Sequence, residues 1–165
     1  MIRPTPIPPQ PGQESVWDYP RPAQWENTNK HLKVVFNGVV IAETRQGRRI
    51  LETSHPPTYY FPESDVNLDY VIQTPDTSLC EWKGRAYYYD VVVNDKKATH
   101  AAWRFFEPTP GFVEMTSYYC FVGRQMDACY VDGELATPQA GNYYGGWITK
   151  DLAGPFKGGP GTMGW

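Results

Sequence analysis

The sequence has 165 residues, enough for one domain with a buried core, and its 15 basic and 18 acidic residues give a net charge of −3. This mild net charge argues against binding to a phosphate backbone, since such binding needs many clustered Lys and Arg. No apolar stretch approaches the roughly 18–20 residues of a membrane span, and residues 1–13 lack the apolar core of a secretory signal. We therefore expect a cytoplasmic protein that binds neither nucleic acid nor a membrane.

The 3 cysteines and 3 histidines are scattered along the chain, and no C-x-x-C pair occurs. Structural zinc sites use Cys and His ligands that include at least one closely spaced pair. The pattern therefore predicts reduced thiols in a cytoplasm, no metal and no cofactor.

The chain begins with an arm, residues 1–31, that is rich in proline and aromatic residues. Residues 1–22 hold seven of the 16 prolines. Proline fixes φ and lacks an N–H, so we expect an extended segment rather than a helix. Trp17, Tyr19 and Trp25 are large apolar groups that need cover, which favours an arm packed on the domain.

A β-hairpin is predicted over residues 32–44, where Asn37-Gly38 separates two apolar runs. Asn-Gly is the strongest short hairpin signal, because both turn positions need a positive φ. A basic stretch and the strand-like residues 50–52 follow. Residues 53–62 contain three prolines, so they form an extended loop or a short strand rather than a helix. Residues 63–70 fit one or two helical turns.

A second hairpin is predicted over residues 85–105, with its turn at Asn94-Asp95. Its first strand has aromatic residues on both faces, because Tyr87 and Tyr89 alternate with Tyr88. We expect a central strand with core on one face and a cleft or a second layer on the other.

Two more strands are predicted, at 118–122 and 127–131, and a turn at Asp132-Gly133 leads into residues 134–136. Beyond residue 136 glycine and proline dominate. We therefore predict a mainly β fold: a core domain of small antiparallel, hairpin-built sheets over residues 32–136, between the N-terminal arm and a Gly-rich C-terminal arm, residues 137–165.

The C-terminal arm contains G-x-G-x-x-G between Gly159 and Gly164, the spacing of a dinucleotide-binding loop. That loop needs a helix after it, and the sequence has one residue left. We expect instead an ordered strap, anchored by Phe156 and Trp165, over the sheet or over a neighbouring subunit. The second alternative implies a homodimer.

Candidate catalytic residues are Cys80, His55 and Lys83. A thiol near a lysine is nucleophilic when its pKa is lowered, and a histidine from the 53–62 loop supplies a base if it lies nearby. The alternative is a buried structural thiol before a tight turn. His55 itself precedes two prolines that fix the backbone, which fits either a preorganised site or a stiff edge.

Candidate ligand-binding residues come from three further places. Arg45, Arg48, Arg49 and Glu52 form either an anion-binding cluster or a solvated turn with an internal ion pair. Tyr59 and Tyr60 point to opposite sides of an extended segment, so one is core and the other, taken as Tyr60, lines a pocket.

The remaining candidates are aromatic residues on adjacent strands. Trp82, Tyr88, Trp103 and Phe105 form either an aromatic cage for a flat or cationic ligand or part of the core.

The combination of motifs resembles domain-of-unknown-function family 427, which is also described as nucleotidyltransferase-like. The segments that carry the resemblance are residues 34–43, 51–62, 80–84, 103, 130–134, 145–149 and 154–158. The resemblance covers residues 32–136, and the arms resemble those of longer bacterial members. The family often has Pro-Tyr between its Cys and Lys, where this chain has Glu81-Trp82.

The resemblance implies a fold similar to the β-tents of methionine sulfoxide reductase B and of the ligand-binding domain of cereblon. Those relatives hold zinc with two C-x-x-C pairs, which this chain lacks, and bind ligands in aromatic-lined clefts. Nucleotidyl transfer needs metal-binding carboxylates, typically Asp-x-Asp after a Gly-Ser turn, and the sequence has no Gly-Ser dipeptide.

The sequence therefore does not support the nucleotidyltransferase description. It favours a domain that binds a small flat or anionic metabolite through His55, Tyr60, Lys83, Trp103 and Tyr88, with Arg45 and Arg49 at the rim. The alternatives are an enzyme that uses Cys80, His55 and Lys83, and an interaction module that docks through its two arms.

Overall fold

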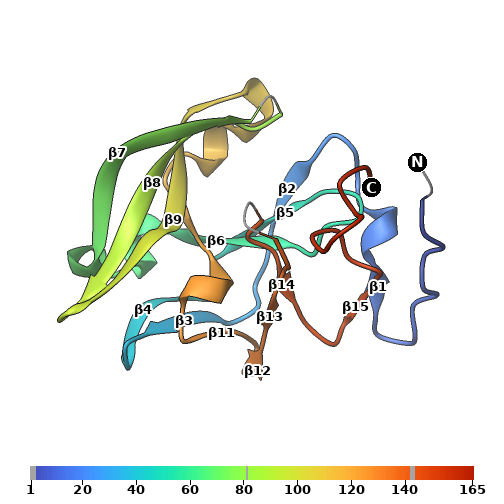
Figure 1. Ribbon diagram of the computed structural model, residues 1–165, viewed down its shortest axis with the longest axis horizontal. Helices are drawn as coiled ribbons and strands as arrows, with labels where there is room; N and C mark the ends of the chain where they lie inside the picture. Colours follow the sequence, from blue (N-terminus) through green and yellow to red (C-terminus); the bar gives the residue numbers. More distant parts are fainter. Residues whose placement is uncertain (1–2, 81, 142–143) are drawn as a thin grey trace.

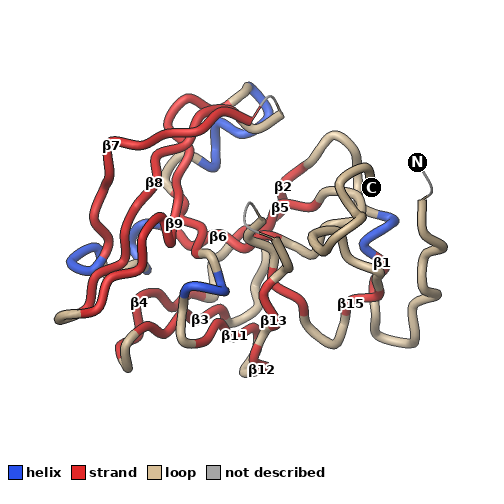
Figure 2. The backbone as a smooth tube through the Cα atoms, in the orientation of Figure 1, coloured by secondary structure: helices blue, strands red, loops and turns tan. Residues whose placement is uncertain are grey.

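The computed structural model describes residues 3–80, 82–141 and 144–165; Glu81, in the sequence between Cys80 and Lys83, lies outside the described residues. The described chain is mainly β and its sheets are largely antiparallel, as predicted (Figure 1). Helical turns are limited to short 3₁₀ segments, which appear as small blue pieces between the strands in Figure 2. No helix among the described residues is long and apolar enough to cross a membrane.

The largest element is a seven-stranded antiparallel sheet with the order β2-β5-β6-β10-β9-β8-β7. Its strands, in chain order, are β2 (Gln24–Asn27), β5 (Arg48–Leu51), β6 (Thr58–Pro62), β7 (Val71–Cys80), β8 (Gly84–Val93), β9 (Lys96–Pro108) and β10 (Tyr118–Phe121). Strand β6 is third in this order and pairs with β5 on one side and β10 on the other.

A four-stranded antiparallel sheet, β12-β11-β3-β4, lies beside the large sheet. It consists of β3 (Leu32–Phe36), β4 (Val39–Thr44), β11 (Ala128–Val131) and β12 (Glu134–Leu135). Two small ladders involve the arms: β1 (Glu14–Ser15) with β15 (Leu152–Ala153), and β13 (Thr137–Pro138) with β14 (Trp147–Ile148).

The predicted hairpins and turns are confirmed. Asn37 and Gly38 have φ of 49° and 77° in the β3–β4 turn, and Asn94 has φ of 54° between β8 and β9. Asp132 and Gly133 turn β11 into β12 with φ of 49° and 80°. The one or two helical turns expected after residue 62 are the 3₁₀ segments Glu63–Asp65 and Leu68–Tyr70.

Both faces of β6 are buried, because the strand lies in the middle of the large sheet with side chains packed on each side. Tyr59 and Phe61 join the main core, whereas Tyr60 points into a second cluster with Phe105 and Cys120. The sequence argument left room for only one of Tyr59 and Tyr60 in the core. That limit is wrong, since Tyr59 is 1% and Tyr60 0% exposed.

The described parts of the two arms pack against each other and against their own chain. β1 pairs in parallel with β15, and the Trp17 ring lies 5.8 Å from that of Trp165. The Trp17 indole N–H also donates to the Pro155 carbonyl (2.9 Å). The C-terminal arm is thus a strap over the N-terminal arm and one end of the large sheet, as Figure 1 shows.

Candidate functional site

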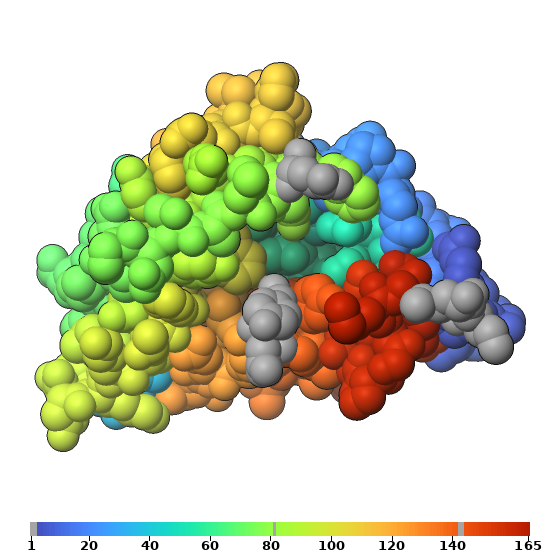
Figure 3. All heavy atoms as spheres, turned by 45° about the horizontal axis from the view of Figure 1, so that its top comes forward, coloured from blue at the N-terminus to red at the C-terminus, as the bar shows by residue number. Residues whose placement is uncertain are grey.

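A cleft of about 310 Å³ opens where the strap crosses the large sheet. Figure 3 shows this hollow between the ends of β7 and β8 (green), the segment around β5 and β6 (teal) and the strap (orange to red). Four parts of the chain line it: the end of β5 with the loop after it, the β7–β8 tip, the middle of β8 and β9, and the strap. The site therefore combines segments that are far apart in the sequence.

The aromatic wall of the cleft is built on β8 and β9, where Tyr88 and Trp103 are cross-strand partners. The Trp103 indole N–H donates to the Tyr60 hydroxyl (3.1 Å), which fixes the ring. Burial raises the pKa of Tyr60 well above its usual value, so this hydroxyl stays protonated. Gly145 of the strap lies against Trp103, and a Cβ at that glycine would come within 2.5 Å of the indole. Trp103 thus presents a flat, rigid apolar surface.

The imidazole of His55 is held in one tautomer by Gln139. The Gln139 side-chain oxygen accepts from the Gly146 amide (3.1 Å), and its nitrogen donates to the Lys157 carbonyl (2.8 Å). These backbone partners fix which end of the amide faces His55, so the amide nitrogen donates to His55 Nδ1 (3.1 Å). A ring nitrogen that accepts carries no proton, so the proton of neutral His55 is on Nε2.

The surroundings of His55 keep the ring uncharged. Burial, together with the positive charges of Lys157, Lys83 and Arg21, lowers the pKa of His55 to about 3. The Glu52 carboxylate lies 3.6 Å from Nε2, outside hydrogen-bond distance. The Gln139 N–H also favours the neutral ring, because it occupies the nitrogen that would have to accept the second proton.

This lowered pKa predicts a pH dependence of stability. Unfolded His55 takes up a proton near pH 6.5, whereas folded His55 does so only near pH 3. The unfolded chain binds more protons within this window, so stability is unchanged above it and falls by up to about 1.4 kcal/mol per pH unit as the pH decreases through it.

Urea unfolding at several pH values between 7.5 and 4.5, with wild type and His55→Gln compared, measures the slope. We expect a shallower fall in the variant, since the other titrating groups are common to both proteins. Parallel curves would contradict the assignment of a buried neutral His55.

Three charged side chains share the cleft with His55. Glu52 lies just after β5, with its carboxylate 4.0 Å from the Lys83 ammonium. Lys157 comes from the strap, and no carboxylate among the described residues forms an ion pair with it. Of the cleft residues that the structure describes, these three groups and a neutral His55 sum to one positive charge.

Cys80 also lines the cleft, at the end of β7, and is partly exposed. Cys120 and Cys129 are buried, and burial raises the pKa of each thiol. The cleft thus holds the three candidates Cys80, His55 and Lys83. Its histidine, however, presents Nε2–H rather than a free basic nitrogen toward Glu52.

The arginines expected at the rim lie elsewhere. Arg49 pairs with Glu14 and Glu26 and so joins the N-terminal arm to β5. Arg48 lies between the rings of Trp25 and Tyr118, 4.4 and 4.3 Å from their centres.

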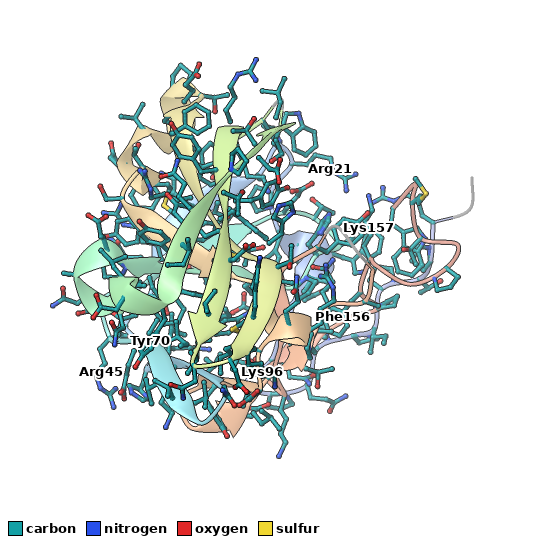
Figure 4. The ribbon with its side chains drawn as sticks, turned by 60° about the vertical axis from the view of Figure 1, so that its left-hand side comes forward. Arg21, Arg45, Tyr70, Lys96, Phe156 and Lys157 are labelled. Atoms are coloured by element: carbon teal, nitrogen blue, oxygen red, sulfur yellow. The ribbon has the colours of Figure 1, made fainter. Side chains whose placement is uncertain are left out.

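Arg45 is exposed at the turn after β4, and Figure 4 shows it far from Arg21 and Lys157. Tyr60 lies behind the wall, in contact with Trp103. Of the residues expected to bind a ligand, the cleft brings together His55, Lys83, Trp103 and Tyr88.

Several cleft residues were not expected from the sequence. Gln139, Tyr144 and Lys157 lie on the strap, more than 80 positions beyond His55 in the sequence. The Tyr144 ring stands edge-on to His55, with centres 5.4 Å apart. Gly145-Gly146 was the available signal: a Cβ at Gly146 would come within 2.7 Å of Pro56, so this pair marks a close approach of the strap to the 53–57 loop.

Comparison with known proteins identifies the family of the chain. No curated protein matched the sequence. The family model described as domain of unknown function DUF427 matches residues 24–132, from β2 through the turn after β11. That match spans most of the chain, all of the seven-stranded sheet and the second sheet except β12, and it contains the β-strands that form the cleft wall. The chain therefore belongs to the DUF427 family.

Proposed function

We propose that the cleft binds a small, flat anion, stacked on Trp103 and held by Lys83 and Lys157. The observation that carries this proposal is the Lys157 ammonium, which faces a partly enclosed cleft with no carboxylate partner among the described residues. Lys83 has a carboxylate at 4.0 Å, so its charge is already partly balanced. An anionic ligand would compensate the excess positive charge where low solvent access strengthens the attraction.

The shape of the cleft supports a planar ligand. Tyr88, Trp103 and Phe105 line the cleft from β8 and β9, and Tyr144 of the strap lines it beside His55. Aromatic surfaces of this kind favour ring stacking, and fixed polar groups at one end of a pocket set the orientation of the ligand. His55 Nε2–H and the two ammonium groups are such polar groups.

Catalysis by Cys80 is the weaker alternative. A nucleophilic thiol needs a base that takes its proton, and His55 has Nδ1 occupied by Gln139 and a proton on Nε2. Docking through the arms is also weaker, because the aromatic rings of Trp17 and Trp165 are packed against each other. The strap supplies walls of the cleft instead.

Binding of aromatic carboxylates tests the proposal. In calorimetric titrations at pH 7.5 we expect 2-naphthoate to bind and the uncharged 2-naphthamide to bind at least about tenfold more weakly. Lys157→Gln is expected to remove most of this difference, because the substituted side chain has similar length and no charge. Lys150→Gln is the matched control, since Lys150 is exposed and outside the cleft.

The proposal fails if no aromatic carboxylate, with or without ring nitrogen, stabilises or binds the protein. It also fails if Lys157→Gln and Lys150→Gln bind 2-naphthoate with equal affinity.

A further inference from the structure

We propose that the ligand of this cleft is a planar nitrogen heterocycle that bears an acidic group, and that Glu52 accepts a hydrogen bond from its ring N–H. This inference rests on the proposed function, because it assigns a second recognition group to the same flat anion. A carboxylate repels an anionic ligand, so the presence of Glu52 in this cleft has to be explained. Its position beside His55 and Lys83 suits it to accept a hydrogen bond from the ligand.

Glu52 is a carboxylate without a hydrogen-bond donor among the described residues. Its side chain is 19% exposed, and the basic groups next to it are His55 Nε2 at 3.6 Å and Lys83 Nζ at 4.0 Å. Both distances exceed those of a hydrogen bond. Neither carboxylate oxygen of Glu52 is sealed from solvent, so water reaches it in the cleft. A ligand that displaces this water must replace its hydrogen bonds, or the carboxylate is left unsatisfied. A donor that enters the cleft would satisfy it.

The backbone around Glu52 is fixed, so the carboxylate stays in the cleft. The Glu52 carbonyl accepts from the His55 amide (3.0 Å), which closes a turn. The Thr53 and Ser54 amides donate to Pro20 and Val16 of the N-terminal arm (3.0 and 2.9 Å), which ties the turn down. Ser54 holds a positive φ of 73°, which only a well-supported turn tolerates in a residue with a side chain.

The arrangement of polar groups selects the class of ligand. Glu52 offers an acceptor, His55 Nε2–H offers a donor beside it, and Lys157 offers a positive charge that no described carboxylate pairs with. A ligand that stacks on Trp103 is flat, so the ligand groups that pair with Glu52, His55 and Lys157 must lie in the plane of its ring. A ring N–H and an acidic substituent on a flat heterocycle meet both conditions, whereas a simple aryl acid leaves the carboxylate of Glu52 unpaired.

Pairs of isosteric ligands that differ only in the ring N–H measure the contribution of that group to binding. Indole-2-carboxylate and benzofuran-2-carboxylate have the same shape and charge and differ by N–H against oxygen; the 3-carboxylates form a second pair with another spacing. By calorimetry at pH 7.5, wild type is expected to prefer the indole of at least one pair by about tenfold or more. Removing the acceptor in Glu52→Met should abolish this preference, and Glu52→Gln, which keeps a neutral acceptor, should reduce it.

Glu107→Met is the matched control, because Glu107 is exposed and outside the cleft. Benzofuran carboxylates are expected to bind Glu52→Met at least as well as wild type, which shows that the variant cleft is intact. If Glu52→Met does not fold, the test is whether Glu52→Gln prefers indole over benzofuran carboxylates less than wild type does. Equal binding of both members of each pair by wild type, or a preference that survives in the Glu52 variants, overturns this inference and leaves anion binding in place. Failure of all four compounds and of 2-naphthoate counts against the proposed function instead.

Discussion

Trp147→Ala is expected to lower the free energy of unfolding by about 3–5 kcal/mol, the usual cost of removing a large aromatic side chain from a core. Trp147 is fully buried, and its ring centre lies 5.3 Å from that of Tyr59 and 6.0 Å from that of Phe61. Of the described strap residues, Trp147 is the one that joins the main core, whereas Leu152 and Phe156 pack in a separate cluster with the N-terminal arm.

The polar contacts of Trp147 add to this cost. Its indole N–H donates to the Phe121 carbonyl (3.3 Å) and its amide donates to the Pro57 carbonyl (2.9 Å). Trp147→Phe keeps most of the packing and loses the indole bond, so we expect a smaller loss of about 1–3 kcal/mol.

Chemical denaturation compares the loss of stability in Trp147→Ala with that in Trp165→Ala. Trp165 also lies on the strap, but it is only partly buried and packs on Trp17 at the surface. Trp147→Ala should also weaken binding of 2-naphthoate, since β14 carries the neighbouring Gly145 and Tyr144 into the cleft. Similar losses of stability in the two variants would contradict the anchoring role of Trp147.

The parts of the fold that the sequence predicted well are those set by local chemistry. Asn37-Gly38 and Asp132-Gly133 demand a positive φ, and they turn the chain wherever they occur between strands. Strands β2 and β7 were not predicted, because they lie at the two edges of the large sheet. Their side chains are mostly exposed, so the alternation that marks a half-buried strand is absent.

For the candidate site, too, the sequence predicted the residues with distinctive chemistry and missed the contacts that depend on distant parts of the chain. His55, Cys80, Lys83 and Trp103 were chosen for their chemistry, and the sheet brings them to one cleft. Arg49 carries equally suggestive chemistry, but Glu14 and Glu26, some 23–35 positions earlier in the chain, occupy its guanidinium. Such pairings depend on how the arm folds back, and no local pattern encodes them.

The strap residues were hardest to predict. Gln139 and Lys157 lie in a Gly-rich segment without periodicity, and their role depends on the path that the strap takes across the sheet. In the sequence, that path is indicated by glycines such as Gly145 and Gly146, which let the strap backbone come close to the rest of the domain.

Gly84→Ala is expected to destabilise the protein by about 3 kcal/mol or more and to remove Lys83 from the cleft. Gly84 has φ of 110°, and a Cβ there would come within 2.2 Å of the Glu107 carbonyl oxygen and 2.6 Å of Pro108 Cα. Both obstacles are backbone atoms of β9, so no side chain can rotate away to make room. Strained backbone costs about 1–3 kcal/mol by itself, and the contact with β9 adds to it.

The effect on the cleft follows from how the β7–β8 tip is attached. The Thr109 amide donates to the Lys83 carbonyl (3.1 Å), and the Thr109 hydroxyl donates to the Trp82 carbonyl (2.7 Å). Separation of Gly84 from β9 would break these bonds and carry Lys83 away from Glu52. Affinity for 2-naphthoate should therefore fall along with stability.

Gly133→Ala is the matched control for Gly84→Ala. Gly133 also has a positive φ, 80°, but no heavy atom lies within 4 Å of its Cβ position. Its substitution is expected to cost only the left-handed backbone, about 1–2 kcal/mol, and to leave 2-naphthoate binding unchanged. Urea unfolding and calorimetric titration of both variants separate steric contact from backbone conformation. If Gly84→Ala proves no more costly than Gly133→Ala and still binds 2-naphthoate normally, the close packing of Gly84 on β9 does not position the Lys83 side of the cleft.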